Sequence, residues 1–126
     1  MDGQDFEKYC ANLLTVFGFT GIVITKGSGD QGVDIVGNYN INKYAIQCKR
    51  YSKKLSNSHI QEVVAGKNFY KCQKALVLTN NYFTEGAIEL ANANDVELWD
   101  RDRLLQLIYY TDNQWNTLLN NLKIEL

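Results

Sequence analysis

Two neighbouring stretches decide the fold and the candidate site: Gly27-Ser28-Gly29-Asp30-Gln31-Gly32-Val33-Asp34-Ile35-Val36 and Lys43-Tyr44-Ala45-Ile46-Gln47-Cys48-Lys49-Arg50. The first is a glycine-rich turn that leads into a short apolar strand. That strand contains Asp34, although strands usually disfavour acids. The second stretch alternates, so Gln47 and Lys49 lie on one face, about 7 Å apart. If the two strands pair as a hairpin, all three polar side chains converge on one small volume.

This trio suits a divalent metal ion and a water molecule. Mg²⁺ takes oxygen ligands in near-octahedral geometry and usually keeps several waters. Asp34 can supply a charged ligand, Gln47 a neutral one, and the main-chain carbonyl of Cys48 a third. Lys49 can orient or help deprotonate an attacking water and offset charge on phosphoryl oxygens. The same spacing also fits an Asp bonded within its own turn, with Gln and Lys at the sheet margin.

Composition restricts the class of protein. With 126 residues, 45% hydrophobic and 21% charged, the chain is expected to form one globular domain over residues 1–126. A basic segment followed by an apolar run is absent from the N-terminus, and no apolar run is long enough to span a bilayer, so a soluble cytoplasmic protein is expected. The chain has three cysteines, Cys10, Cys48 and Cys72, and no CxxC pair. This excludes a disulfide framework and a zinc site of the usual spacing.

The charge is unevenly distributed along the chain. Residues 26–74 carry nine Lys or Arg against three acids, a net +6, whereas residues 1–25 carry −2 and residues 75–126 carry −5. Five of the basic residues lie between Lys43 and Lys54, with Tyr44 and Tyr51 among them. Such a cluster is typical of a solvated strand end and loop. Beside a carboxylate it also suits a phosphodiester substrate, because phosphate contacts supply sequence-independent affinity.

Periodicity and capping residues predict the order of elements. The expected elements are a helix over 4–17, strands over 22–25, 33–36 and from 43, a helix over 59–71, a strand over 75–79, a helix over 85–93 capped by Thr84, a strand over 96–99, a helix capped by Asp100, and a last helix over 111–126. The first three strands should form an antiparallel meander, with the apolar strand over 75–79 beside the third. This order predicts an α/β sandwich with a mixed sheet.

Four polar residues near these elements have two interpretations each. Glu7 suits the first turn of its helix but can also reach over the sheet edge toward the site. Gln61 has capping-box spacing from Ser58, or else faces the site. His59 is expected to be exposed or bonded to the backbone, with phosphate contact as the alternative. Asp30 is either an ordinary turn acid or a partner of the metal ligands.

The motifs together resemble a known family. Residues 30–35 read D-x-G-x-D-I and residues 47–51 read Q-C-K-R-Y. Further matches follow in order: Asp5-Phe6-Glu7, Leu13-Leu14, Gly18-Phe19, Val77-Leu78-Thr79-Asn80-Asn81, Phe83-Thr84, Gly86-Ala87 and Leu98-Trp99-Asp100. Over about residues 3–108 the chain resembles the catalytic domain of Mrr-like restriction endonucleases, within the PD-(D/E)XK nuclease superfamily. Only the last helix lies outside the resemblance.

The resemblance implies a three-layer α/β sandwich, a central mixed sheet of about five strands flanked by helices. It implies a metal-binding acid at Asp34, a catalytic lysine at Lys49, a Q-x-K motif beginning at Gln47, and a site glutamate at Glu7 that contacts the metal directly or through water. The implied cofactor is Mg²⁺ or Mn²⁺, and the implied activity is DNA cleavage leaving 5′-phosphate and 3′-hydroxyl ends. Gln47 replaces the carboxylate of the wider superfamily, and Val33 replaces its proline; Mrr-like members share the glutamine.

The expected partner is DNA. The residues expected to bind it lie around the catalytic strand: Arg50, Lys53, Lys54, Ser28, Gln31 and Tyr51. Tyr51 either stacks on a base or covers the sheet. Larger family members often carry a separate recognition domain, so specificity here is expected from loops, from a homodimer, or from a partner protein.

Two alternatives to a restriction-type nuclease remain. One is a structure-selective nuclease of the junction-resolving kind, which shares the site. The other is a catalytically silent DNA-binding subunit of a defence or repair complex, against which the retention of Asp34, Gln47 and Lys49 argues.

Overall fold

The fold is built on a five-stranded mixed sheet with the spatial order β1-β2-β3-β4-β5. A computed structural model describes residues 3–25 and 32–109. The predicted last helix and three of the predicted polar residues, Ser28, Asp30 and Gln31, lie outside them. The strands are β1 (Thr20–Ile24), β2 (Ile35–Tyr39), β3 (Asn42–Lys49), β4 (Lys74–Thr79) and β5 (Val96–Trp99).

Connection length sets the strand directions. β2 and β3 are joined by a two-residue turn at Asn40 and Ile41, and Asn40 takes the positive φ of 55° that this tight turn needs. β1, β2 and β3 are therefore antiparallel. The helices α2 (Asn57–Phe69) and α3 (Glu85–Ala93) form the crossovers to β4 and β5, so β3, β4 and β5 are parallel. The predicted meander and the place of β4 beside β3 are confirmed.

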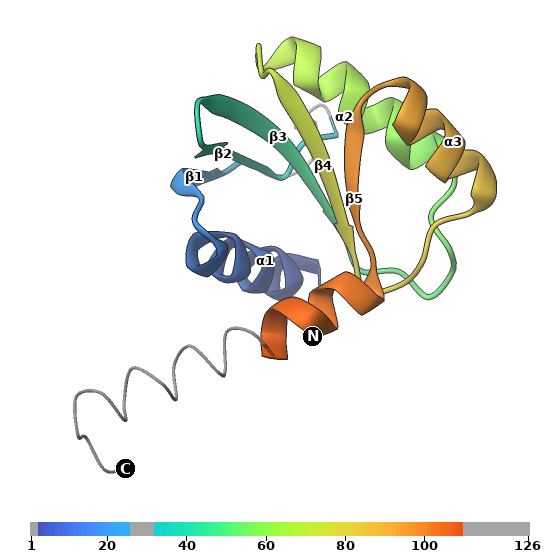
Figure 1. The fold of residues 1–126 in the computed structure, drawn as a ribbon, viewed down its shortest axis with the longest axis horizontal. Helices are drawn as coiled ribbons and strands as arrows, with labels where there is room; N and C mark the ends of the chain where they lie inside the picture. The colour runs from blue at the N-terminus through green and yellow to red at the C-terminus, as the bar shows by residue number, and fades with distance from the viewer. Residues whose placement is uncertain (1–2, 26–31, 110–126) are drawn as a thin grey trace.

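Helices cover both faces of the sheet, which makes the three-layer α/β sandwich that was predicted. Helix α1 (Gly3–Phe17) lies on one face, and α2 and α3 lie on the other (Figure 1). The helical segment 101–109 packs on the α1 face, since Leu104 and Leu107 share an apolar cluster with Phe6 and Leu14. None of the described helices is long and apolar enough to cross a membrane.

The alternation of β3 separates two environments. Ile46 and Cys48 point into the apolar cluster under α1, together with Ile35, Leu76 and Leu78. Ala45 and Gln47 lie on the α2 face, and the side chain of Gln47 donates a hydrogen bond to Glu62 of α2. The α2 face of β3 is therefore apolar at first and polar toward its carboxyl end.

Two helix caps agree with the sequence and one does not. Thr84 Oγ1 accepts a hydrogen bond from Ala87 N at 3.1 Å, and Asp100 Oδ1 accepts one from Arg103 N at 3.0 Å. The predicted capping box of Ser58 and Gln61 is wrong, because α2 begins two residues earlier and Ser56 is its N-cap. The N3 residue is His59, whose Nδ1 accepts a hydrogen bond from Ser56 N at 3.2 Å.

The start of β2 also differs from its prediction. The strand begins at Ile35, so Asp34 lies just before it instead of inside it. The main chain of Asp34 bonds Ile46 and Thr25, and its side chain accepts from the N–H of Cys48, a main-chain donor of β3. This removes the conflict between an acid and a strand interior.

Candidate active site

Asp34 is held against β3 on both sides of Gln47. Its main-chain N–H donates to the carbonyl of Ile46 at 2.8 Å, and its Oδ2 accepts from the N–H of Cys48 at 2.8 Å. The N–H and C=O of one strand residue lie on the same edge of the strand, so the carbonyl of Cys48 also faces the Asp34 side. The carboxylate and this carbonyl are thus brought together by the backbone.

The Gln47 side chain is buried on the α2 face, with 5% of the residue exposed. Its Nε2 donates to the carbonyl of Gly32 and to Oε2 of Glu62 on α2, each at 3.2 Å. Its Oε1 is buried and has no hydrogen-bond partner among the described residues. Buried polar atoms are nearly always paired, so an orphan amide oxygen marks a position where a ligand fits.

Glu7 approaches the site from the opposite face of the sheet. The pKa of the Cys48 thiol lies well above its ordinary value of 9.0. The hydrogen bond with Cys10 and burial raise this pKa most, and the negative charges of Asp34 and Glu7 raise it further. Asp34 also contacts Cys48 directly through the hydrogen bond that it accepts from the Cys48 N–H. Glu7 also lines a pocket of about 210 Å³ with Gln4, Lys8, Ile24 and Thr25.

Thr25 connects this pocket to Asp34. Its N–H donates to the carbonyl of Asp34 at 2.8 Å, and its hydroxyl donates to the carbonyl of Val33 at 2.6 Å. The residues on either side of the glycine-rich turn are therefore bonded to each other, which fixes the position of Asp34 relative to Thr25.

Lys49 ends β3 on the same face as Gln47. Its Nζ lies over the ring of Tyr51, 5.5 Å from the ring centroid, where an ammonium is attracted by the aromatic face. The other neighbour of that ring is His59, with centroids 5.6 Å apart in an edge-to-face arrangement. Tyr51 therefore packs against Lys49 and His59, a contact that neither of its two predicted roles included, and His59 is bonded to the backbone as expected.

The loop after β3 is fastened to the end of β4. The N–H of Tyr51 donates to Oδ1 of Asn80 at 2.7 Å, and Nδ2 of Asn81 donates to the carbonyl of Tyr51 at 3.2 Å. Because the two strands are parallel, their carboxyl ends lie side by side and their loops can bond in this way. The basic side chains of this loop, Arg50, Lys53 and Lys54, are all exposed.

The donor set fits a hard divalent cation. Among residues 3–25 and 32–109, no group of three or more His, Cys, Asp or Glu side chains is arranged to hold a metal ion. The oxygens that Asp34 and the end of β3 offer are of mixed kind: the Asp34 carboxylate, the orphan Oε1 of Gln47 and the carbonyl of Cys48. Carboxylate, amide and carbonyl oxygens are the ligands that Mg²⁺ and Mn²⁺ accept.

Glu62 is the residue that the sequence interpretation missed. Gln61, which was considered as a site residue, is exposed, whereas its neighbour Glu62 reaches Gln47. Both residues lie between Ile60 and Val63, which are buried. Their place on the helix therefore gave no signal that separates Glu62 from Gln61.

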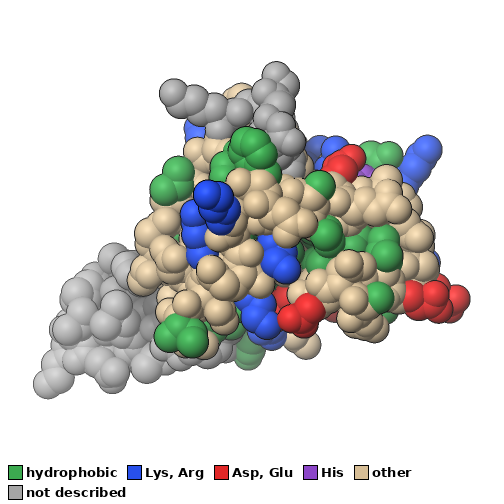
Figure 2. All heavy atoms as spheres, turned by 90° about the horizontal axis from the view of Figure 1, so that it is seen from above, with side chains coloured by type: hydrophobic (Ala, Val, Ile, Leu, Met, Phe, Trp, Pro, Cys, Tyr) green, Lys and Arg blue, Asp and Glu red, His purple; other side chains and the backbone are tan. Residues whose placement is uncertain are grey.

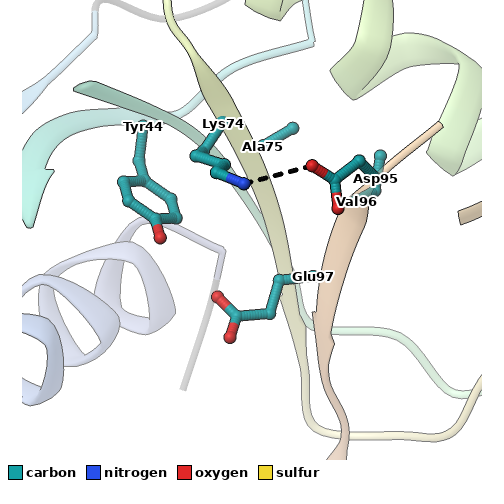
Figure 3. A pocket seen from close by; sticks show the side chains of 6 residues that line it. All are labelled: Tyr44, Lys74, Ala75, Asp95, Val96 and Glu97. Atoms are coloured by element: carbon teal, nitrogen blue, oxygen red, sulfur yellow. Dashed lines mark hydrogen bonds and ion pairs between the residues drawn. The ribbon is translucent and has the colours of Figure 1, made fainter. Parts of the chain in front are cut away.

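A second pocket lies at the other end of the strands and is separate from this site. It is lined by residues at the amino ends of β3, β4 and β5: Tyr44, Lys74, Ala75, Asp95, Val96 and Glu97 (Figure 3). Lys74 and Asp95 form an ion pair at 3.1 Å across it. Acidic and basic side chains lie next to one another on the surface seen from this end (Figure 2), and charges of both signs side by side are typical of a solvated surface.

One protein family matches most of the chain. The family model of the Mrr catalytic domain, described as a restriction endonuclease, matches residues 1–108. The chain belongs to the Mrr restriction endonuclease family. The match includes Glu7, Asp34, Gln47 and Lys49 and stops before the predicted last helix. No curated protein sequence matches this Mrr-family chain.

Solved structures share its fold. The DNA modification-dependent restriction endonuclease AspBHI has a TM-score of 0.68 at 14% identity, over 94% of this chain and 35% of its own. MspJI restriction endonuclease in complex with a 27-mer oligonucleotide has a TM-score of 0.65 at 20% identity, over 85% of this chain and 28% of its own. AF1548, a protein of unknown function, has a TM-score of 0.58 at 20% identity, over 75% of this chain and 55% of its own.

The Mrr-family chain thus spans between about a quarter and just over half the length of these similar structures. At these identities the likeness establishes the restriction-endonuclease fold alone.

Proposed function

We propose that this chain is a Mg²⁺- or Mn²⁺-dependent deoxyribonuclease that hydrolyses phosphodiester bonds to leave 5′-phosphate and 3′-hydroxyl ends. The observation that carries the proposal is the buried, unpartnered Oε1 of Gln47, on the strand residue whose two neighbours are bonded to Asp34, in a chain of a restriction endonuclease family. An unpaired buried oxygen costs about 1–3 kcal/mol. A cation at this position would remove that cost.

Three groups would hold the cation: the Asp34 carboxylate, Oε1 of Gln47 and the main-chain carbonyl of Cys48. Glu7 would add a second charge, directly or through water, which matters because an amide is a weaker ligand than a carboxylate. When bound, the cation would polarise a phosphoryl oxygen and lower the pKa of a bound water.

Lys49 would act on the water and the phosphate. Its ammonium would orient the attacking water, stabilise the hydroxide that forms when this water gives its proton to solvent, and offset charge on the phosphoryl oxygens. The water oxygen would form a bond to phosphorus while the bond from phosphorus to the 3′ oxygen breaks, and that oxygen would take a proton from solvent and leave as a 3′-hydroxyl. Tyr51, which covers the Lys49 ammonium, would limit the positions it can take.

DNA would lie along the loop that follows β3. The exposed Arg50, Lys53 and Lys54 are the proposed phosphate contacts. Ser28 and Gln31 are proposed contacts from the glycine-rich turn. The similar MspJI structure contains an oligonucleotide, and AspBHI is described as modification-dependent, which supports DNA as the partner here. Specificity would come from loops, a homodimer or a partner protein.

The test is a cleavage assay on four DNA substrates, supercoiled, linear, single-stranded and branched, with Mg²⁺, Mn²⁺ or EDTA. Metal-dependent cutting of duplex DNA is expected, with ends that DNA ligase can join. Cutting of branched DNA alone would identify a junction-resolving nuclease instead. Binding without cleavage of any substrate would identify a silent DNA-binding subunit and overturn the proposal.

A further inference from the structure

The amide of Gln47 has one orientation that satisfies its surroundings. Its nitrogen carries two hydrogens, and each one points to an oxygen, the carbonyl of Gly32 or Oε2 of Glu62. Turning the amide over would place Oε1 against these same two oxygens and leave them without donors. The two acceptors therefore select the orientation that leaves Oε1 on the opposite side, away from Glu62.

Gly32 and Glu62, the residues that carry the two acceptors, are in direct contact. Gly32 has a φ of 74°, and a Cβ at this residue would lie 2.7 Å from the carbonyl oxygen of Glu62 and 3.0 Å from its Cβ. The loop before Asp34 thus rests directly on the backbone of α2 at Glu62. One of the acceptors is main chain, so Glu62 is the one that a side-chain substitution can remove.

We propose that Glu62 is a positioning residue for the candidate metal site: its carboxylate holds the nitrogen of Gln47, so that the amide oxygen faces the cation. This rests on the proposed function, because it assigns the orphan oxygen to a metal. It also accounts for the departure from the wider superfamily, in which a carboxylate occupies the position of Gln47. In this chain the negative charge is carried by Glu62 of α2, which bonds the proposed ligand Gln47.

The direct test is Mn²⁺ binding by calorimetry, in the absence of DNA, for wild type, Glu62→Ala and Glu62→Gln. Removing a group that orients a metal ligand typically lowers metal affinity about 10- to 100-fold, and we expect a loss in this range for both variants. Glu62→Gln should be affected although it keeps an acceptor, because its amide can also donate to Oε1 and stabilise the wrong orientation. The matched control is Glu89→Gln, an exposed acid on α3, which should bind as wild type does.

The thermal midpoint Tm separates positioning from loss of fold. Both Glu62 variants should keep a Tm close to wild type without metal, since Glu62 is exposed and the Gly32 carbonyl still accepts from Gln47. Unchanged Mn²⁺ affinity in Glu62→Ala would overturn the proposal. Complete loss of binding, equal to that of Asp34→Ala, would also overturn it, because Glu62 would then be a ligand itself.

A reciprocal exchange tests the contact without any metal. Gln47→Glu places a carboxylate against Glu62 and the Gly32 carbonyl, three acceptors with no donor, and should lower Tm by about 4 °C or more. Adding Glu62→Gln to the same chain returns a donor and should restore most of the loss. A double variant no more stable than Gln47→Glu would overturn the proposal.

The two readouts distinguish this proposal from the proposed function. If wild type neither binds Mn²⁺ nor cleaves DNA, the proposed function fails, and with it the assignment of Oε1 to a metal. The Tm exchange would still report whether Glu62 orients residue 47.

Discussion

The two ends of the parallel strands carry opposite kinds of polar group. At the amino end, Lys74 and Asp95 pair with each other in solvent, with 38% and 83% of their side chains exposed. At the carboxyl end, Gln47 is buried and one of its oxygens is unpartnered among the described residues. A solvated pair is satisfied without a ligand, whereas a buried unpaired oxygen is destabilising until something binds it. Burial without a partner, more than charge, therefore distinguishes the end of the sheet that holds the proposed site.

The largest effect is expected at the carboxyl end, from Asp34→Ala or Lys49→Ala. Each removes a charged group from the reaction, which typically costs about a thousandfold in rate. The measurement is nicking of supercoiled DNA with Mg²⁺, with Tm as the control for folding. An active Lys49→Ala would contradict the role given to the ammonium.

The next effect should come from the glycine beneath the site. Gly32→Ala forces a side chain into positive φ and into the backbone of Glu62, which should destabilise the fold by about 1–3 kcal/mol. Chemical denaturation measures this loss. Gly3→Ala is the matched control, because a Cβ there meets nothing within 4 Å. Equal stability of the two variants would show that α2 yields easily at this point.

A smaller effect is expected from the basic loop. Lys53→Ala combined with Lys54→Ala should weaken DNA binding and reduce the slope of log affinity against log salt by about 0.9 for each phosphate that the variant no longer neutralises. Fluorescence anisotropy at several salt concentrations gives this slope. Lys67→Ala, in the last turn of α2, is the control. An unchanged slope in the double variant would place the DNA elsewhere.

The smallest effect should come from the amino end, where Asp95→Ala removes the ion pair. The hydrogen bond and charge of Asp95 raise the pKa of Lys74 above its ordinary value of 10.5. A raised lysine pKa contributes stability below pH 10.5 and loses it as pH rises through the folded pKa. Both partners are well solvated, so Tm at pH 7 and DNA cleavage should stay at wild-type values. A clear loss of cleavage would show that the amino end of the sheet also contributes to the activity.

Most of the fold was predictable from local patterns. The run of apolar residues over 75–79 indicated a buried strand, and Thr84 and Asp100 marked helix starts by their capping chemistry. The start of α2 was misplaced by two residues, because Ser56 and Ser58 are equally good caps by type. His59 decided between them, since its ring accepts the hydrogen bond from Ser56, and histidine is not a usual partner in that motif.

The site was predictable only in part. Strand alternation placed Gln47 and Lys49 on one face, and the family resemblance supplied Glu7. Neither could supply Glu62, because the contact between α2 and Gln47 joins residues fifteen apart across a crossover. The same holds for Asn80 and Asn81, which bond Tyr51 from the loop that follows the neighbouring strand β4.

By itself the sequence determined the α/β order of elements, the hairpin of β2 and β3, and the residue types of the Asp34, Gln47 and Lys49 trio, because these depend on periodicity, turns and side-chain chemistry within a short range. The tertiary structure decided how the trio is oriented. Asp34 bonds β3 on both sides of Gln47, and Gly32 and Glu62 hold the amide nitrogen so that its oxygen is left without a partner among the described residues. Hydrogen bonds are directional, and their partners here come from segments that meet only after the sheet and α2 have packed.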